Sequence, residues 1–205
     1  MIIRTLSAAA LLAASALVSH AAAATPATAT TALNIRTGPG PQYNVIGVIN
    51  GNAQTTVTGC IQGSLWCQVM HNGVQGWAYS QYLAMDRSGQ TVVIAREPAS
   101  VPVVTYQAPA GTVETVGAAP SLAGTIVEPA GEPLVIEPPP APVGSYVVSH
   151  PVDPAYLGGE VVVGAALPPT VALNPVPDYE YQYAYVNRMP VLVEPGSRRI
   201  VYIYR

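Results

Sequence analysis

The stretch from Leu33 to Leu83 places the strongest limit on what this chain can fold into. It holds both cysteines and both tryptophans of the 205-residue sequence. Short apolar runs alternate there with turn signals that contain Gly or Asn, which is typical of closely spaced strands. The stretch therefore predicts a small, self-contained all-β unit.

The apolar runs of this unit predict five strands. The expected ranges are 33–36, 45–49, 55–61, 66–70 and 75–78. The tripeptide His71-Asn72-Gly73 separates the last two strands, and we expect a hairpin turn there because Asn and Gly accept a positive φ at little cost. A unit of about 50 residues buries only a thin core and is marginal without further stabilisation.

Two cysteines are candidates for that stabilisation. Cys60 and Cys67 lie on neighbouring predicted strands with six residues between them. In an oxidising compartment such a pair favours a disulfide, and the chain-entropy model gives it roughly 2–3 kcal/mol. The alternative is a metal site of Cys60, Cys67 and His71, which lacks an evident fourth ligand. We expect the disulfide and no metal.

Residues 1–24 have the pattern of a secretory signal peptide. Arg4 supplies a positive charge, an apolar run of small residues extends from Leu6 to Val18, and Ala21-Ala22-Ala23 fits a cleavage site. A membrane anchor needs about 20 apolar residues, and this run is shorter and interrupted by serine. We expect an exported protein, periplasmic or secreted, with no membrane span after cleavage.

The composition changes on both sides of the β unit. Residues 25–31 are an Ala/Thr/Pro lead that we expect to be flexible, and the β domain is expected at 32–85. Residues 86–150 include ten prolines from Pro98 to Pro142 and scattered acids, without lasting apolar periodicity. This range predicts a disordered, Pro-rich acidic linker.

Residues 151–205 return to a β pattern and form the last expected domain. Tyrosines occupy alternating positions from Tyr179 to Tyr185, a period-two pattern that predicts a strand with one aromatic face. Further strands are expected at 189–193 and 199–204, joined by the turn Glu194-Pro195-Gly196-Ser197 with a positive φ at its glycine. The expected product is a small three-stranded antiparallel meander.

Charge is unevenly distributed along the C-terminal half. Nine acids and no arginine lie from Glu97 to Glu180, whereas four arginines follow from Arg188 onward. Two interpretations stay open. The tail docks on the acidic arm, or the two regions form separately solvated surfaces.

The available side chains argue against an enzyme. All eight basic residues are Arg, so no lysine-dependent phosphate loop or Schiff base can form. After the signal, His71 and His150 are the only histidines, and both cysteines lie in the β unit, which predicts no Cys–His pair and no zinc cage. The net charge of −3 gives no sign of nucleic-acid binding. We expect no catalytic residues and no cofactor.

Several motifs of the β unit occur together in a known family. They are Leu33-Asn34-Ile35-Arg36-Thr37-Gly38-Pro39-Gly40, Tyr43 with Val45-Ile46, Trp66-Cys67-Gln68-Val69, and Gly76-Trp77-Ala78 followed by Tyr82-Leu83. In this order and spacing they resemble a bacterial Src-homology-3 (SH3-like) domain. The resemblance implies a strongly bent, five-stranded small β-barrel. It also implies a non-catalytic targeting module of exported proteins, often bound to peptidoglycan or other wall peptides. A subgroup of the family has the same cysteine pair.

The tail resembles an alphaproteobacterial domain of unknown function. The matching stretches are Leu173-Asn174-Pro175-Val176-Pro177, Tyr185-Val186-Asn187, Pro190-Val191-Leu192-Val193 and Arg198-Arg199-Ile200-Val201-Tyr202. The Asn-Gly turn usual in that family is Asn187-Arg188 here. This resemblance implies an architecture and a Gram-negative periplasmic setting, but no activity.

Two functions are compatible with these expectations. In the first, an exported, non-enzymatic protein binds peptidoglycan or cell-wall peptide through its barrel. The candidate ligand-binding residues are Asn34, Tyr43, Trp66, Trp77, Tyr79 and Tyr82. Exposed aromatic side chains give apolar contact area at low entropic cost, and core packing is the alternative for each.

In the second function, an envelope structural or interaction protein binds a protein partner through the barrel or the Tyr-rich meander. The oligomeric state is not predicted.

Overall fold

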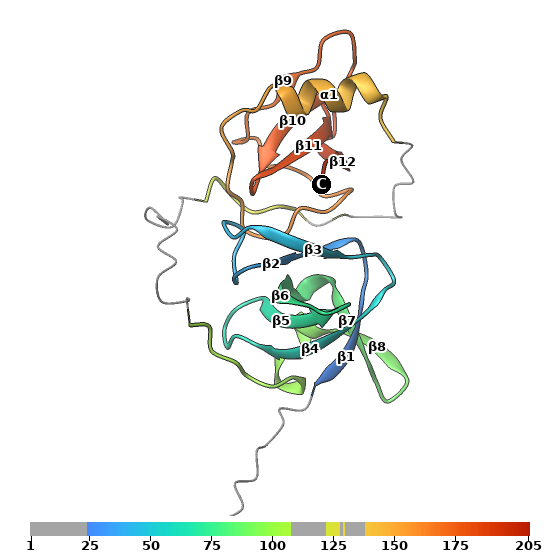
Figure 1. The fold of residues 1–205 in the computed structure, drawn as a ribbon, viewed down its shortest axis with the longest axis vertical. Helices are drawn as coiled ribbons and strands as arrows, with labels where there is room; N and C mark the ends of the chain where they lie inside the picture. Colours follow the sequence, from blue (N-terminus) through green and yellow to red (C-terminus); the bar gives the residue numbers. More distant parts are fainter. Residues whose placement is uncertain (1–23, 108–121, 128, 130–137) are drawn as a thin grey trace, which may run out of the picture.

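The structure is a computed structural model that describes residues 24–107, 122–127, 129 and 138–205. It is mainly β, with a curled N-terminal sheet and a smaller C-terminal sheet stacked along the long axis of the molecule (Figure 1). The predicted fold class, a small SH3-like β-barrel followed by a small antiparallel unit, is confirmed, although the barrel is an open, curled sheet with eight strands and not the expected five. The predicted signal peptide, apart from residue 24, and residues 108–121, 128 and 130–137 of the predicted linker lie outside the described residues. No helix in the described ranges is both long and apolar enough to cross a bilayer.

The N-terminal sheet, called the barrel domain below, has eight antiparallel strands in the order β3-β2-β6-β5-β4-β1-β7-β8. Its elements are β1 (Thr25–Ala29), β2 (Leu33–Arg36), β3 (Val45–Ile49), β4 (Gln54–Cys60), β5 (Trp66–His71), β6 (Val74–Tyr79), η1 (Ser80–Tyr82), β7 (Leu83–Arg87) and β8 (Gln90–Val93). The five predicted strands are present as β2 to β6. The expected hairpin between β5 and β6 is also present, with positive φ at Asn72 and Gly73.

The prediction of a flexible lead at 25–31 is wrong. Thr25–Ala29 forms β1, which pairs with both β4 and β7. Its Ala27 and Ala29 are buried in the core. Short Ala and Thr runs show little period-two contrast, but backbone hydrogen bonds to two neighbours hold this strand in the sheet.

The predicted linker at 86–150 is ordered at both ends, which corrects its expected disorder there. It begins with the end of β7 and continues through β8, η2 (Ile94–Arg96) and η3 (Pro98–Ser100), and it ends with α1 (Ala141–Ser149). Single buried residues such as Ile94 and Val101 anchor the first part. Pro142 lies in the first turn of α1, where proline is tolerated because that N–H has no helical partner.

Cys60 and Cys67 lie opposite each other on β4 and β5 and form the predicted disulfide. Because both sulfur atoms are bonded, the alternative metal site with His71 is ruled out. Within the described residues no group of three His, Cys, Asp or Glu side chains has metal-binding geometry.

The C-terminal sheet has four antiparallel strands in the order β12-β11-β10-β9. They are β9 (Asn174–Pro175), β10 (Gln182–Val186), β11 (Met189–Glu194) and β12 (Arg199–Ile203). The predicted meander is β10 to β12, and the first strand starts at Gln182 rather than Tyr179. The predicted positive φ at Gly196 is wrong: Arg198 has it instead, with φ 55°. The Arg198 N–H donates to the Glu194 carbonyl at 2.8 Å, so the turn is one residue wider than a β-turn.

The two faces of the C-terminal sheet pack against different parts of the chain. One face carries Tyr183, Leu192 and Val201 and packs on Val143 and Val147 of α1. The other face, with Val186 and Val191 among its residues, belongs to the same buried cluster as the barrel core. Residues 157–171 lie between the two sheets and contribute Leu157, Val161, Val162 and Leu167 to that cluster.

Candidate functional site

A buried ion pair joins the barrel domain to the segment that precedes the C-terminal sheet. The Arg36 guanidinium donates twice to the Glu160 carboxylate, from Nε to Oε2 at 2.8 Å and from Nη2 to Oε1 at 2.6 Å. Both side chains are fully buried. Two parallel charge-assisted bonds fix the mutual orientation of the groups as well as their distance. The pair therefore sets the position of the 157–171 segment on β2.

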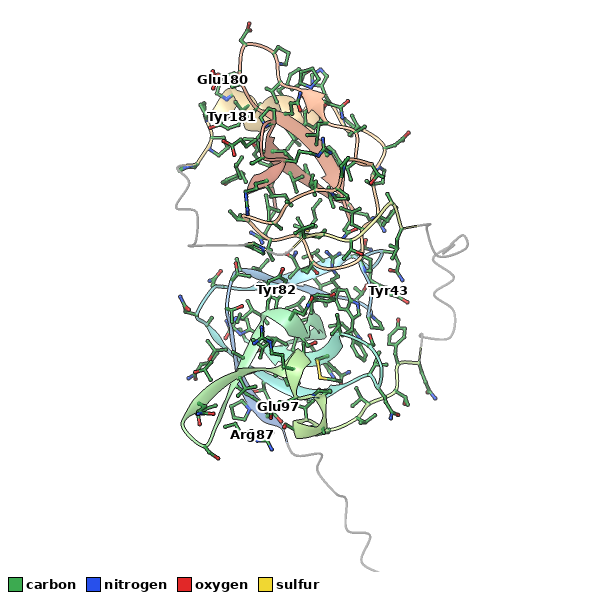
Figure 2. All side chains as sticks on the ribbon, turned by 180° about the vertical axis from the view of Figure 1, so that it is seen from behind. Tyr43, Tyr82, Arg87, Glu97, Glu180 and Tyr181 are labelled. Carbon is green, nitrogen blue, oxygen red and sulfur yellow. A yellow bond between two sulfur atoms is a disulfide. The ribbon has the colours of Figure 1, made fainter. Side chains whose placement is uncertain are left out.

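The same guanidinium also organises the loop before β3. Arg36 Nη1 donates to the carbonyls of Pro41 at 3.2 Å and Tyr43 at 2.9 Å. Arg36 thus links the loop that carries Tyr43 to the Glu160 carboxylate. A second ion pair, Arg87–Glu97, lies on the part of the barrel domain remote from the C-terminal sheet (Figure 2). It is partly exposed to solvent, and such pairs contribute little to stability.

Asn34, a predicted ligand-binding residue, is fully buried at this interface. Its Nδ2 donates to Glu160 Oε1 at 2.9 Å and contacts the Met189 sulfur at 3.3 Å, while its Oδ1 accepts from Arg205 Nε at 3.3 Å. The C-terminal domain therefore covers the amide that we expected to face a ligand. Its observed role is to hold the two domains together.

Trp77 and Tyr43 are joined by a residue that the sequence did not single out. The Tyr106 ring stands edge-on to Trp77 at 5.4 Å and to Tyr43 at 5.8 Å between ring centroids. The segment Val101–Tyr106, called the strap below, pairs with β4 through Cys60 N to Pro102 O at 2.8 Å and Val104 N to Cys60 O at 3.0 Å. Gly59 permits this approach, because a Cβ there would lie 2.9 Å from the Pro102 oxygen.

The other predicted aromatic residues pack inside the barrel domain. Trp66, Trp77, Tyr79 and Tyr82 are each less than a tenth exposed. The Trp66 and Tyr79 rings are opposite each other on β5 and β6, with centroids 5.4 Å apart, and Tyr82 lies 6.3 Å from Tyr79. These four residues therefore have core positions, and of the six predicted contacts only Tyr43 is more than slightly exposed. Their binding role stays a prediction.

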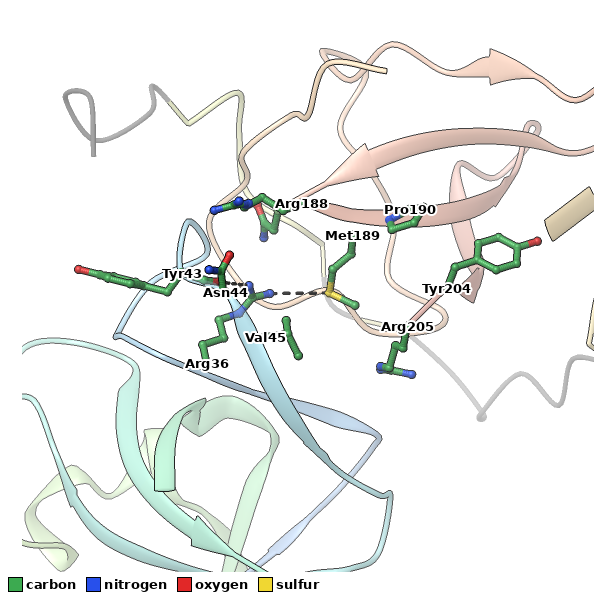
Figure 3. Close-up of a pocket in the computed structure, with 10 residues that line it drawn as sticks. Arg36, Tyr43, Asn44, Val45, Arg188, Met189, Pro190, Tyr204 and Arg205 are labelled. Atoms are coloured by element: carbon green, nitrogen blue, oxygen red, sulfur yellow. Dashed lines mark hydrogen bonds between the residues drawn. The ribbon is translucent and has the colours of Figure 1, made fainter. Parts of the chain in front are cut away.

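A pocket of about 620 Å³ opens where the two domains meet. The barrel domain lines it with Arg36, Tyr43, Asn44 and Val45, and the C-terminal domain with Asn187, Arg188, Met189, Pro190, Tyr204 and Arg205. Figure 3 shows Met189 and Arg36 at its centre, with Arg188 and Arg205 on either side. Pockets formed between two domains are common ligand sites.

The pocket has a cationic lining. Three of its residues are arginines and none is an acid, although Glu160 beneath it neutralises Arg36. Burial lowers the pKa of Arg205, and the nearby Glu160 carboxylate opposes that shift. Burial raises the pKa of Tyr204 to about 12, with a smaller contribution from Tyr202. The Tyr204 phenol is therefore neutral at neutral pH.

The sequence did not identify Arg36, Glu160, Arg188 or Arg205 as site residues. The uneven charge was the available signal, and both of its interpretations missed the partners. Glu160 of the acidic region pairs with Arg36 of the barrel domain. Arg198 donates to the carbonyls of Leu167, Pro168 and Val171, and Arg199 to that of Gly164. These carbonyls lie at 164–171, within the predicted C-terminal domain and not in the predicted linker at 86–150, so neither interpretation describes these contacts.

The N-terminal domain is a curled antiparallel half-barrel with an open pocket at its edge. A family model described as bacterial SH3 domain matches residues 31–84, and one described as domain of unknown function (DUF1236) matches residues 146–205. The chain thus contains a bacterial SH3 domain followed by a DUF1236 domain, as both resemblances in the sequence indicated. A comparison with curated proteins gives no match.

Proposed function

We propose that this is an exported periplasmic protein that binds peptidoglycan or another cell-wall peptide in the pocket between its SH3 and DUF1236 domains. The observation that carries the proposal is the composite lining of that pocket. A bacterial SH3 domain supports a binding role for peptides or proteins in general. We assign the proposed site to this pocket because both domains contribute side chains to its lining.

The chemistry of the pocket suits a peptide. Tyr43 and Tyr204 offer aromatic surface, Val45 and Pro190 offer apolar contacts, and the arginines offer hydrogen-bond donors. Ligand sites typically combine such an apolar lining with a few fixed polar groups. The buried Arg36–Glu160 pair holds the barrel wall of the pocket in place, which favours a preformed site.

The alternative function, a partner bound by the Tyr-rich meander, gains less support. Tyr183 and Tyr185 donate their hydroxyls to the carbonyls of His150 and Val147 at 2.9 and 3.1 Å. The aromatic face is therefore occupied by α1 and the residue that follows it. We retain the wall-peptide site as the proposal.

Retention of the purified protein on purified peptidoglycan tests the proposal. The wild-type protein is expected in the pellet, and Tyr43→Leu is expected to reduce the retained fraction while keeping apolar bulk against Tyr106. Tyr179→Leu is the matched control, because Tyr179 is exposed and lies outside the pocket. Wild-type retention no higher than that of an unrelated periplasmic protein would remove the proposal.

A further inference from the structure

We infer that Arg188 is an anion-binding residue of this pocket and that the peptide it takes carries free carboxylates. The inference rests on the proposed function and adds the chemical class of the ligand. Three observations carry it: the backbone of Arg188, the way its turn is anchored, and the charge of the pocket.

Arg188 has a backbone conformation that suits glycine. Asn187 and Arg188 form the two-residue loop between β10 and β11, with φ 50° and 68°. Positive φ at both loop positions is the type I′ geometry, for which Asn-Gly is the preferred pair. A long side chain at the second position is strained there. A glycine at this position would relieve the backbone strain, so the presence of arginine indicates a function for its side chain.

The turn is anchored from below by the Asn187 amide. This buried side chain accepts from the Leu157 N–H at 2.8 Å and donates to the carbonyls of Leu157 at 3.1 Å and Gly159 at 3.3 Å. Glu160, the partner of Arg36, follows directly in the chain. The base of Arg188 is therefore tied to the same segment that joins the two domains, and a rigid support of this kind improves the placement of a binding group.

The guanidinium of Arg188 is available for a ligand. It is exposed, and in the part of the chain that the structure describes it makes no hydrogen bond or ion pair. Arg36 uses its donors on Glu160, Pro41 and Tyr43. Among the described residues, Arg205 makes two long hydrogen bonds, to Asn34 at 3.3 Å and Ala32 at 3.5 Å.

Arginine recognises a carboxylate through two parallel N–H donors, which makes a carboxylate the matching ligand group. Arg188 and Arg205 lie on opposite sides of Met189 (Figure 3). Two separated cations fit an extended peptide with more than one carboxylate better than they fit a single small anion. The primary contact is assigned to Arg188, because Arg205 is partly engaged.

The test uses the full protein with two forms of one probe. Purified peptidoglycan is compared with the same material after its carboxyl groups have been converted to methylamides. Wild-type protein is expected to bind the native form about tenfold more tightly than the amidated form, the scale of one lost charge-assisted contact. Arg188→Gly is expected to bind the native form about tenfold more weakly than wild type and to show little preference between the two forms.

Two controls separate charge from folding. Arg188→Gly relieves a strained φ, so its thermal midpoint should equal or exceed that of wild type. Arg96→Gln removes an exposed arginine from η2, outside the pocket, and should leave binding unchanged.

Equal wild-type binding to both forms, or unchanged binding by Arg188→Gly, would overturn the inference and leave the proposed function standing. No wild-type binding to native peptidoglycan would overturn both.

Discussion

The barrel domain and the C-terminal domain are stabilised in different ways. The barrel domain has a disulfide, a strap and a core built largely from its own strands. The C-terminal sheet has its own helix on one face, but its other face shares a buried cluster with the barrel. The difference indicates that one face of the C-terminal sheet relies on an apolar cluster shared with the barrel and the 157–171 segment. The barrel has its disulfide and the core from its own strands in addition to that cluster and the buried ion pair.

That dependence predicts a hierarchy of stability. Breaking the ion pair should uncouple the unfolding of the two domains. A substitution inside the barrel should leave the C-terminal sheet folded, as long as the barrel itself still folds. Changes confined to the C-terminal tyrosines should have the smallest effects.

Glu160→Ala should have the largest effect. It leaves the Arg36 guanidinium buried without a counter-charge, and removing one partner of such a pair costs about 3–5 kcal/mol. We expect unfolding to start at a lower urea concentration than in the wild-type protein and to occur in two steps, one for each domain. Both tryptophans lie in the barrel domain, so tryptophan fluorescence follows that domain while far-UV circular dichroism follows both.

Asp153→Ala is the matched control for this change. Asp153 is exposed, and a surface substitution of this kind usually changes stability by less than about 0.5 kcal/mol. A Glu160→Ala protein that unfolds in one step at the wild-type midpoint would show that the ion pair does not couple the domains.

Replacement of both Cys60 and Cys67 by Ser should have the next largest effect. The loss of a cross-link that closes so short a loop predicts a decrease of about 2–3 kcal/mol in the free energy of unfolding. The change should appear in the tryptophan signal of the barrel domain. An equal decrease in the free energy of unfolding in a Glu160→Ala background would show that the disulfide and the ion pair contribute separately, because the effects of distant and independent sites add.

Tyr106→Ala should have an intermediate effect. It removes two edge-to-face contacts, to Trp77 and Tyr43, each worth about 0.5–1.5 kcal/mol beyond area burial. The strap should then loosen, and Trp77 emission should shift to the red as its ring becomes hydrated. Val103→Ala is the control, because Val103 is 64% exposed in the same strap. An unshifted emission spectrum in Tyr106→Ala would argue against the strap as the cover of Trp77.

Alkaline pH should give the smallest effect, confined to the C-terminal domain. Burial raises the pKa of Tyr183, Tyr185 and Tyr204, the last to about 12. As pH rises, these phenols therefore lose their protons in the unfolded chain before they do so in the folded protein, near the ordinary tyrosine pKa of about 10. Stability is therefore constant below that pH and falls as pH rises toward the folded pKa values. The slope of unfolding free energy against pH between 10 and 12 should decrease in Tyr204→Phe, and an unchanged slope would contradict this assignment.

Local patterns in the sequence predicted β2 to β6 and β10 to β12, since their apolar residues repeat with the period of a sheet, but not β7, β8 or β9. The disulfide was also predictable, because its partners lie on adjacent strands of one hairpin. The β1 strand was not, because Ala27 and Ala29 are buried in a run that has no polar contrast. The start of the linker was missed because single buried residues such as Ile94 anchor it.

The site was less predictable than the fold. The aromatic candidates were chosen by residue type, and most of them are core residues because a barrel this small has few other large side chains to fill it. The pocket depends on Arg36 and Glu160, which are 124 residues apart. A pairing between two distant, isolated charges leaves no local pattern. Arg188 did carry a local signal, the departure from Asn-Gly in its turn, but its meaning depended on what lies beside that turn.

The most direct test of the composite binding site is an NMR titration of the ¹⁵N-labelled protein with muramidase-solubilised peptidoglycan. We predict chemical-shift changes on both walls of the pocket, at residues 43–45 and 187–189, and none at Gln90–Val93 on the opposite edge of the barrel sheet. Shift changes restricted to one domain, or none up to millimolar fragment, would contradict a site shared by the two domains.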